Sequence, residues 1–140
     1  MIAEVDDSDP LAGALLSEDA VARGRDGRWT LLGGACRSCG TRMFPRASVC
    51  PACMSEDVVE EEMPRDGSVY SFTVVHVGPE RWIKPMTVGY VDLTNGARVF
   101  AHLRGQVVIG SDVTLALDTV GRSADGTPLR NFVFAKGERS

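Results

Sequence analysis

The chain has 140 residues, 44% of them hydrophobic, and a formal net charge of −4 at pH 7. This length suits one domain, or one small domain with an appended module, and the apolar content is enough for a packed core. No apolar run approaches the ~20 residues that a membrane helix needs, and the amino terminus is acidic where a secretory signal would be basic, so we expect a cytoplasmic protein without a membrane segment.

The negative charge is concentrated in residues 1–20, which hold six acidic residues and no Lys or Arg. The rest of the chain carries 13 acidic and 15 basic residues, and 13 of the basic ones are Arg. A general nucleic-acid binder usually has a basic excess or a concentrated basic face, and this balance indicates neither.

The first predicted element is a helical leader, residues 1–28. Asp9 fits a helix N-cap, Pro10 fits the first helical position, and leucines 11, 15 and 16 then lie on one side. A second short turn is expected from Ser17 to Gly24. Because so short a helix is unstable alone, its Leu face must dock on the chain's own body or on a partner.

A rubredoxin-like zinc ribbon is expected over residues 29–63, entered by a short strand at Arg28–Leu32. Its sequence signal is two C-x2-C pairs separated by ten residues: Cys36, Cys39, Cys50 and Cys53. Each pair can form a tight knuckle that aims two sulfurs at one point, and two knuckles complete a tetrahedron that suits Zn²⁺. Gly40 follows the first knuckle, where the backbone often takes a positive φ.

Other uses of these cysteines fit less well. Two disulfides would suit a short secreted protein, and a redox pair would need one reactive C-x2-C in a thioredoxin-like setting. A rubredoxin-type iron site uses the same four ligands, and the sequence does not separate iron from zinc. In either case four thiolates leave the metal no open position, so the metal is structural and no cysteine remains as a nucleophile.

Four residues of the ribbon are candidate contacts for a partner or for coenzyme A. Arg37, Arg42 and Arg46 lie among the cysteines with no acidic residue between positions 36 and 53. They either neutralise the thiolates and extend into solvent, or also offer an anion contact. Phe44, at the ribbon tip, is expected to pack against the neighbouring domain or a ligand. Residues 57–62 form an extended exit with a solvated acidic face.

The remaining residues, 64–140, predict a five-stranded OB-fold barrel, with a five-stranded sandwich as the alternative. Apolar alternation and turn residues place the strands, and Asn95-Gly96 is the strongest hairpin signal. In the first strand Tyr70, Phe72 and Val74 share one face. The expected strands are residues 68–77, 87–93, 97–103, 113–118 and 130–135.

The loop of residues 78–86 unites a bulky apolar pair with two cations. Trp82 and Ile83 lie beside Arg81 and Lys84 on a connection that is normally solvated. The loop is therefore either tucked back onto the barrel or a contact site for a partner. The same residues are candidates for lining the entrance to a coenzyme A site.

The order of these motifs resembles one family. A four-cysteine ribbon followed by Phe-Pro, then GSVYSFTVV from Gly67, then P-x-x-VGYVDL from Pro85, is similar to the zinc-ribbon/OB-fold accessory proteins of thiolase-like enzymes. The resemblance runs from about Trp29 to about Leu117, and this chain has Met86 where the family often has an aromatic residue. Family members serve a benzoylsuccinyl-CoA thiolase, an acetoacetyl-CoA thiolase with 3-hydroxy-3-methylglutaryl-CoA synthase, and a steroid side-chain aldolase.

The resemblance implies a non-catalytic subunit of a thiolase-type enzyme, in a heteromeric complex such as a heterotetramer, that completes or covers the partner's acyl-CoA site. The residues agree, because we find no catalytic set, and His76 and His102 are each expected to be ordinary hydrogen-bonded sheet histidines. The alternative is an OB-fold module for single-stranded nucleic acid, with stacking from Phe72, Phe100 and Phe132.

Overall fold

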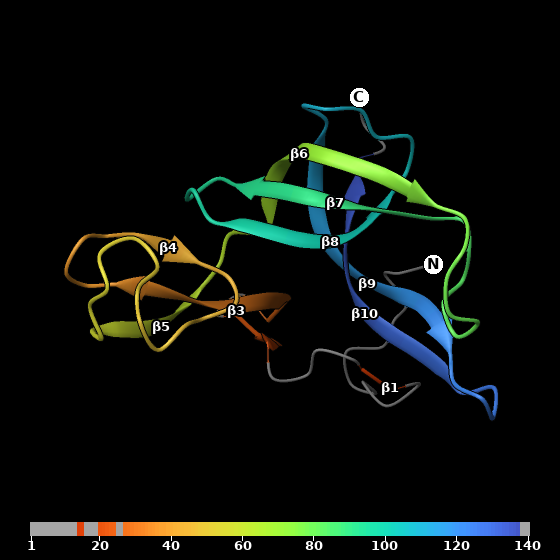
Figure 1. Ribbon diagram of the computed structural model, residues 1–140, viewed down its shortest axis with the longest axis horizontal. Coiled ribbons are helices and arrows are strands. Elements are labelled where there is room, and N and C mark those ends of the chain that lie inside the picture. The colour runs from red at the N-terminus through yellow and green to blue at the C-terminus, as the bar shows by residue number, and fades with distance from the viewer. Residues whose placement is uncertain (1–13, 16–19, 25–26, 138–140) are drawn as a thin grey trace.

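The computed structural model describes residues 14–15, 20–24 and 27–137, and its architecture is almost entirely β (Figure 1). No α-helix occurs in the described part of the chain. The strands are β1 (Ala14–Leu15), β2 (Val21–Arg23), β3 (Trp29–Cys36), β4 (Arg42–Met43), β5 (Val58–Glu62), β6 (Asp66–Val75), β7 (Met86–Leu93), β8 (Arg98–Arg104), β9 (Asp112–Arg122) and β10 (Pro128–Lys136).

The prediction of an N-terminal helical segment is not supported by the described residues of the leader. Where it is described, it forms strands: β1 pairs in parallel with β10, and β2 pairs antiparallel with β3. Val21 in β2 is 6% exposed and belongs to the main core. At residues 21–23 strand pairing and burial therefore override the local turn signal. The proposed N-cap at Asp9-Pro10 lies outside the described residues.

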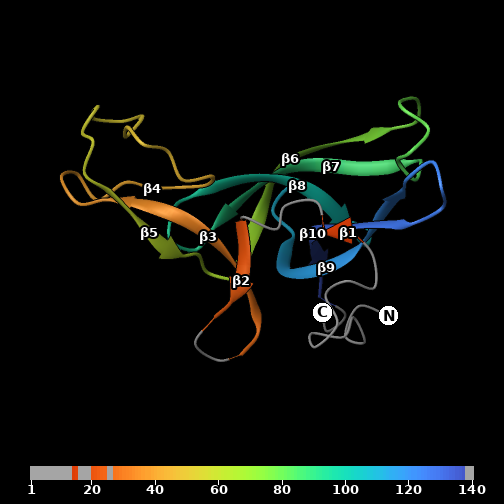
Figure 2. The ribbon, with the colours of Figure 1, turned by 90° about the horizontal axis from the view of Figure 1, so that it is seen from below.

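Five strands close into a barrel. β6, β7 and β8 form an antiparallel meander, β8 pairs in parallel with β10, β10 pairs antiparallel with β9, and β9 returns to β6. Figures 1 and 2 show this barrel on one side of the molecule, with β3, β4 and β5 gathered at the other. This is the strand order of the predicted OB-fold barrel, so the closed five-stranded barrel is confirmed.

The Asn95-Gly96 turn joins β7 to β8 as predicted. Gly96 has φ 95°, and the Asn95 side-chain carbonyl accepts a hydrogen bond from the Ala97 N–H (3.1 Å). By contrast, the simple alternation expected in β6 is interrupted, because the pairing register with β7 shifts between Val69 and Ser71. An irregularity of this kind re-aims side chains, and the extra residue here is Tyr70.

The ribbon and the barrel share one hydrophobic core. Leu31 from β3 is fully buried in the cluster formed by the barrel strands. The Phe44 ring meets the Phe132 ring edge-on at 5.7 Å. Arg65, between the two parts, donates to the backbone carbonyls of Trp29 in the ribbon and Leu115 in the barrel. The ribbon is thus packed on the barrel rather than tethered to it.

No helix in the described residues is both long and apolar enough to cross a membrane.

Candidate metal centre and exposed surfaces

Two knuckles with the same backbone hydrogen bonds position the four cysteines. In the first, the Gly40 N–H donates to the Cys36 carbonyl (2.8 Å), and the Cys36 N–H donates to the Thr41 carbonyl (2.9 Å). In the second, the Met54 N–H donates to the Cys50 carbonyl (2.9 Å), and the Cys50 N–H donates to the Ser55 carbonyl (2.8 Å). Each C-x2-C pair is therefore held in the turn that its spacing predicts.

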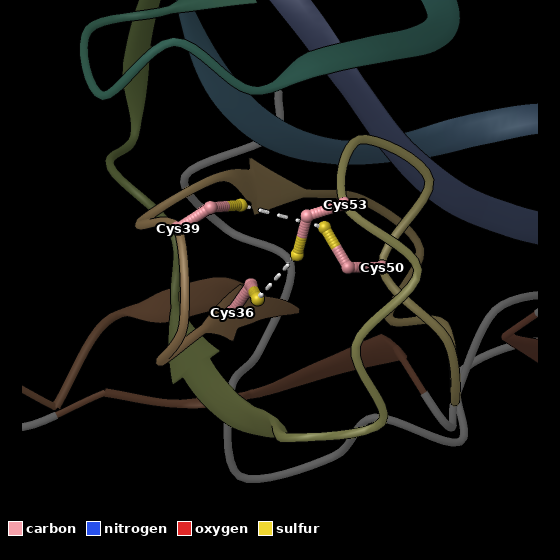
Figure 3. Close-up of side chains that lie close together, drawn as sticks. All are labelled: Cys36, Cys39, Cys50 and Cys53. Carbon is pink, nitrogen blue, oxygen red and sulfur yellow. Dashed lines mark hydrogen bonds between the residues drawn. The ribbon is translucent and has the colours of Figure 1, made fainter.

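The four sulfurs converge on one point (Figure 3). All four ligand atoms lie within 4.8 Å of one another, with Cys36 and Cys53 sulfurs 3.6 Å apart and Cys39 and Cys50 sulfurs 3.7 Å apart. A tetrahedron with Zn–S bonds of about 2.3 Å has edges of about 3.8 Å. The donor set and its spacing fit a closed, structural zinc site, as the sequence predicts.

Hydrogen bonds already favour the thiolate form of two of these sulfurs, those of Cys39 and Cys36. The Thr41 hydroxyl lies 3.1 Å from the Cys39 sulfur and lowers the pKa of Cys39 to about 6. The backbone N–H of Cys39 in turn lowers the pKa of Cys36. At Cys53 the Ser55 N–H favours the thiolate, but the neighbouring sulfurs of Cys39 and Cys36 outweigh it and raise the pKa of Cys53 to about 12. A bound divalent cation supplies the positive charge that lets all four ionise, so binding releases protons.

The second knuckle contains a strained residue that the first avoids. Gly40 has φ 83° and Met54, at the matching position, has φ 69°. A left-handed conformation costs a residue with a Cβ about 1–2 kcal/mol, and glycine avoids this cost. Glycine loses more conformational entropy on folding, which offsets part of the advantage. Since Met54 is 73% exposed, its side chain contributes little packing.

We expect Met54→Gly to stabilise the zinc-bound protein by roughly 0.5–1 kcal/mol. Urea unfolding of the holoprotein measures the difference. The control is the reverse type of substitution at the matching position, Gly40→Ala, which imposes the same strain on the first knuckle and should destabilise the protein. A destabilised Met54→Gly protein, or a neutral Gly40→Ala protein, would show that φ at these positions does not limit stability.

All three ribbon arginines are exposed, and two of them form ion pairs with acidic residues outside positions 36–53. The Arg37 guanidinium donates to the Asp57 carboxylate (3.0 Å), and the Arg42 guanidinium donates to Glu61 (2.9 Å), which raises the pKa of Arg42. The exit strand β5 folds back across β3, so acidic residues outside positions 36–53 offset these charges. Arg46 is exposed and has no ion pair in the described residues, which leaves it as the ribbon's available cation.

The loop of residues 78–86 is fastened to β9. Trp82 forms a backbone bridge with Gly121, the Arg122 N–H donates to the Arg81 carbonyl (2.7 Å), and the Ile83 N–H donates to the Val120 carbonyl (3.1 Å). The Lys84 ammonium is held inside the loop by the carbonyls of Pro79 and Trp82. Of the four candidate contact residues, Arg81 and Ile83 remain exposed, whereas Trp82 and Lys84 are partly buried.

Gly121 allows this close approach. A Cβ on Gly121 would lie 2.2 Å from the Arg81 carbonyl oxygen, so Gly121→Ala must displace the loop. We expect a loss of about 1–3 kcal/mol in the free energy of unfolding and a changed Trp82 fluorescence in a Trp29→Phe background.

The matched control is Gly78→Ala in the same loop, where an added Cβ would meet nothing within 4 Å. We expect this control to unfold within about 0.5 kcal/mol of the parent protein. Equal effects of the two substitutions would contradict the fastening of the loop through Gly121.

The two histidines differ from the expectation. His76 follows β6 and is exposed. His102 lies in β8, with its ring centroid 6.0 Å from that of Trp82, and its buried Nε2 has no hydrogen-bond partner in the described structure. Burial and the nearby charge of Arg104 lower the pKa of His102. The imidazole is therefore a packed, neutral group rather than the hydrogen-bonded sheet histidine we predicted.

Sequence reasoning named Tyr70 and Phe100 separately but did not predict that they form an exposed aromatic group with Tyr90 on the barrel. Tyr70, Tyr90 and Phe100 are 51%, 44% and 56% exposed on β6, β7 and β8. The available signal was the position of Tyr90 and Phe100 beside inward-facing Val91 and Val99. Among the three residues considered for base stacking, Phe132 is unsuitable because it is buried in the core.

A four-cysteine zinc ribbon that shares its core with a closed OB-fold barrel defines the class of this protein. The family described as ChsH2, rubredoxin-like zinc ribbon domain, matches residues 23–59, and that described as ChsH2, C-terminal OB-fold domain, matches residues 60–118. The chain belongs to this ChsH2-type family of zinc-ribbon/OB-fold proteins.

Named relatives are subunits and scaffold proteins. The chain is 36% identical over 115 residues to the benzoylsuccinyl-CoA thiolase subunit BbsA of Thauera aromatica, covering 79% of this chain and 80% of that one. It is 37% identical over 84 residues to a DUF35 domain-containing scaffold protein of Methanocaldococcus jannaschii, covering 58% and 57%. A solved structure, the Ltp2-ChsH2(DUF35) aldolase, matches with TM-score 0.54 and 31% identity over 73% of this chain and 84% of that one.

Proposed function

We propose that this protein is a non-catalytic accessory subunit of a thiolase-type acyl-CoA enzyme, with the carbon–carbon bond chemistry carried by the partner. The observation that carries the proposal is its similarity, at 36% identity over four fifths of each chain, to a thiolase subunit. The solved relative is likewise a complex, between Ltp2 and ChsH2.

The chemistry of this chain supports the same division of labour. Thiolase chemistry needs a cysteine that accepts an acyl group and a base that activates it. All four cysteines of the chain lie at the metal centre, so none is left to accept an acyl group, and the buried Nε2 of His102 has no hydrogen-bond partner in the described structure that it could activate. Nothing in the described residues or in these comparisons supports the alternative of a nucleic-acid module.

The finer features of the proposal concern contacts and assembly. Arg46 of the ribbon and Arg81 of the loop are exposed cations that suit phosphate or carboxylate groups, so we place them nearest to the partner's acyl-CoA entrance. We also propose a cytoplasmic heterotetramer of two such subunits with two enzyme subunits. Residues 29–63 and 64–140 act in it as ribbon and barrel, with residues 1–28 as leader.

Co-expression tests the proposal directly. The chain is produced together with the thiolase-type subunit encoded nearest to it in the genome, and a tag on one chain is used for purification. We expect both chains to elute together in a fixed ratio during size-exclusion chromatography. Failure of the two chains to form a complex would reject the proposed function.

A further inference from the structure

One face of the barrel carries an exposed aromatic platform. We define it as Tyr70, Tyr90, Phe100 and Arg98, whose guanidinium stacks on the Tyr70 ring. The three rings come from the neighbouring strands β6, β7 and β8, which lie side by side in Figures 1 and 2. About half of each ring-bearing residue is exposed. Scattered exposed apolar residues are ordinary, but a contiguous group of this kind marks an interaction site.

The platform is held rigid before any partner binds. Tyr90 and Phe100 are directly paired across β7 and β8, with ring centroids 5.1 Å apart in an edge-on arrangement. The Arg98 guanidinium lies 3.6 Å from the centre of the Tyr70 ring. Because the side chains within each of these two pairs already touch, binding costs less side-chain entropy than ordering separate exposed residues would.

The charge of the platform decides what it can bind. Its one cation, Arg98, forms a bidentate ion pair with Asp92 on the adjacent strand, with Nε 2.6 Å from Oδ1 and Nη2 3.2 Å from Oδ2. The platform is therefore neutral as a whole. A single-stranded nucleic acid requires uncompensated cations that follow its phosphates, whereas an apolar protein surface requires none. Aromatic rings and Arg are also the residues that dominate protein interfaces.

We propose that this aromatic platform is the principal docking surface for the thiolase-type subunit, through an apolar patch on that subunit. This inference rests on the proposed function and adds the surface that performs it. It places the main contact on strands β6, β7 and β8, in addition to the exposed cations Arg46 and Arg81.

The test compares two variants in the complex with the thiolase-type subunit encoded nearest to the chain in the genome. Tyr90→Thr/Phe100→Thr removes two rings while keeping residues that favour β-strands. The matched control is Ile109→Thr, which removes an apolar side chain that is 70% exposed on the connection between β8 and β9. Zinc content and thermal unfolding verify that each variant is folded, and isothermal titration measures the Kd.

We expect the double variant to raise the Kd by at least about tenfold and Ile109→Thr to leave it unchanged. If the wild-type chain binds and the double variant loses no more affinity than Ile109→Thr, the docking surface is wrong while the proposed function stands. If the wild-type chain does not bind, the proposed function fails and the inference fails with it.

Should the double variant fail to fold, Phe100→Thr alone carries the same comparison with the same outcomes, because Phe100 is the most exposed ring. If the wild-type chain binds an oligothymidine in a salt-dependent manner and the ring variant abolishes that binding, the platform recognises nucleic acid and the proposal is overturned.

Discussion

Replacing one zinc ligand should unfold the ribbon. In Cys39→Ser we expect stoichiometric zinc to be lost, because a neutral hydroxyl replaces one of the four converging thiolates. The ribbon has only a small core of its own, formed by Cys36, Met43, Cys50 and Val58, so it depends on the metal to hold its two knuckles together. Zinc content by elemental analysis and circular dichroism measure the two losses.

The control for this substitution is Ser38→Ala in the same knuckle, which removes an exposed hydroxyl hydrogen-bonded to Ser55 (3.0 Å) but keeps every sulfur. It should bind zinc as the parent protein does. A Cys39→Ser protein that keeps a full equivalent of zinc, or a native fold without metal, would contradict a structural role for the site.

Removing the Phe44 ring should weaken the packing of the ribbon on the barrel. Phe44 is half-buried and meets Phe132 edge-on across the boundary between the two parts. Phe→Ala substitutions in full cores cost about 3–5 kcal/mol, so for this partly exposed ring we expect about 2 kcal/mol in the free energy of unfolding. Zinc binding should survive, because Phe44 lies outside the knuckles. Urea unfolding and zinc analysis test both statements.

Val49→Ala is the matched control for Phe44→Ala. Val49 is an apolar ribbon residue that is 37% exposed and stands outside both core clusters. It should change stability by about 0.5 kcal/mol or less. If Phe44→Ala is as mild as Val49→Ala, the shared core contributes little and the ribbon is a tethered module.

The metal centre and the barrel were predictable because their signals are local. Two C-x2-C pairs predict two knuckles whatever the fold of the rest of the chain, and Asn95-Gly96 predicts a hairpin between two strands of alternating hydrophobicity. Five short strands with turn residues between them then leave few closed arrangements. Such features depend on spacing within ten or twenty residues, which the sequence displays directly.

The rest depends on pairing between distant segments. Val21 of the leader is a strand residue because it pairs with β3 and packs in the main core. No pattern in the sequence of residues 17–24 indicates this pairing. Arg42 finds Glu61 only after β5 folds back along β3. The register shift at Tyr70 and the fastening of Trp82 to Gly121 are likewise consequences of tertiary contacts.

The central claim is that this chain assists a thiolase-type enzyme without performing chemistry itself. The most direct measurement is the rate of acyl-CoA thiolysis by the neighbouring thiolase-type subunit during titration with this protein. We expect this protein alone to be inactive, and the rate to rise and saturate at one equivalent per enzyme subunit. A thiolase-type subunit that is fully active alone, or thiolysis by this chain by itself, would contradict the claim.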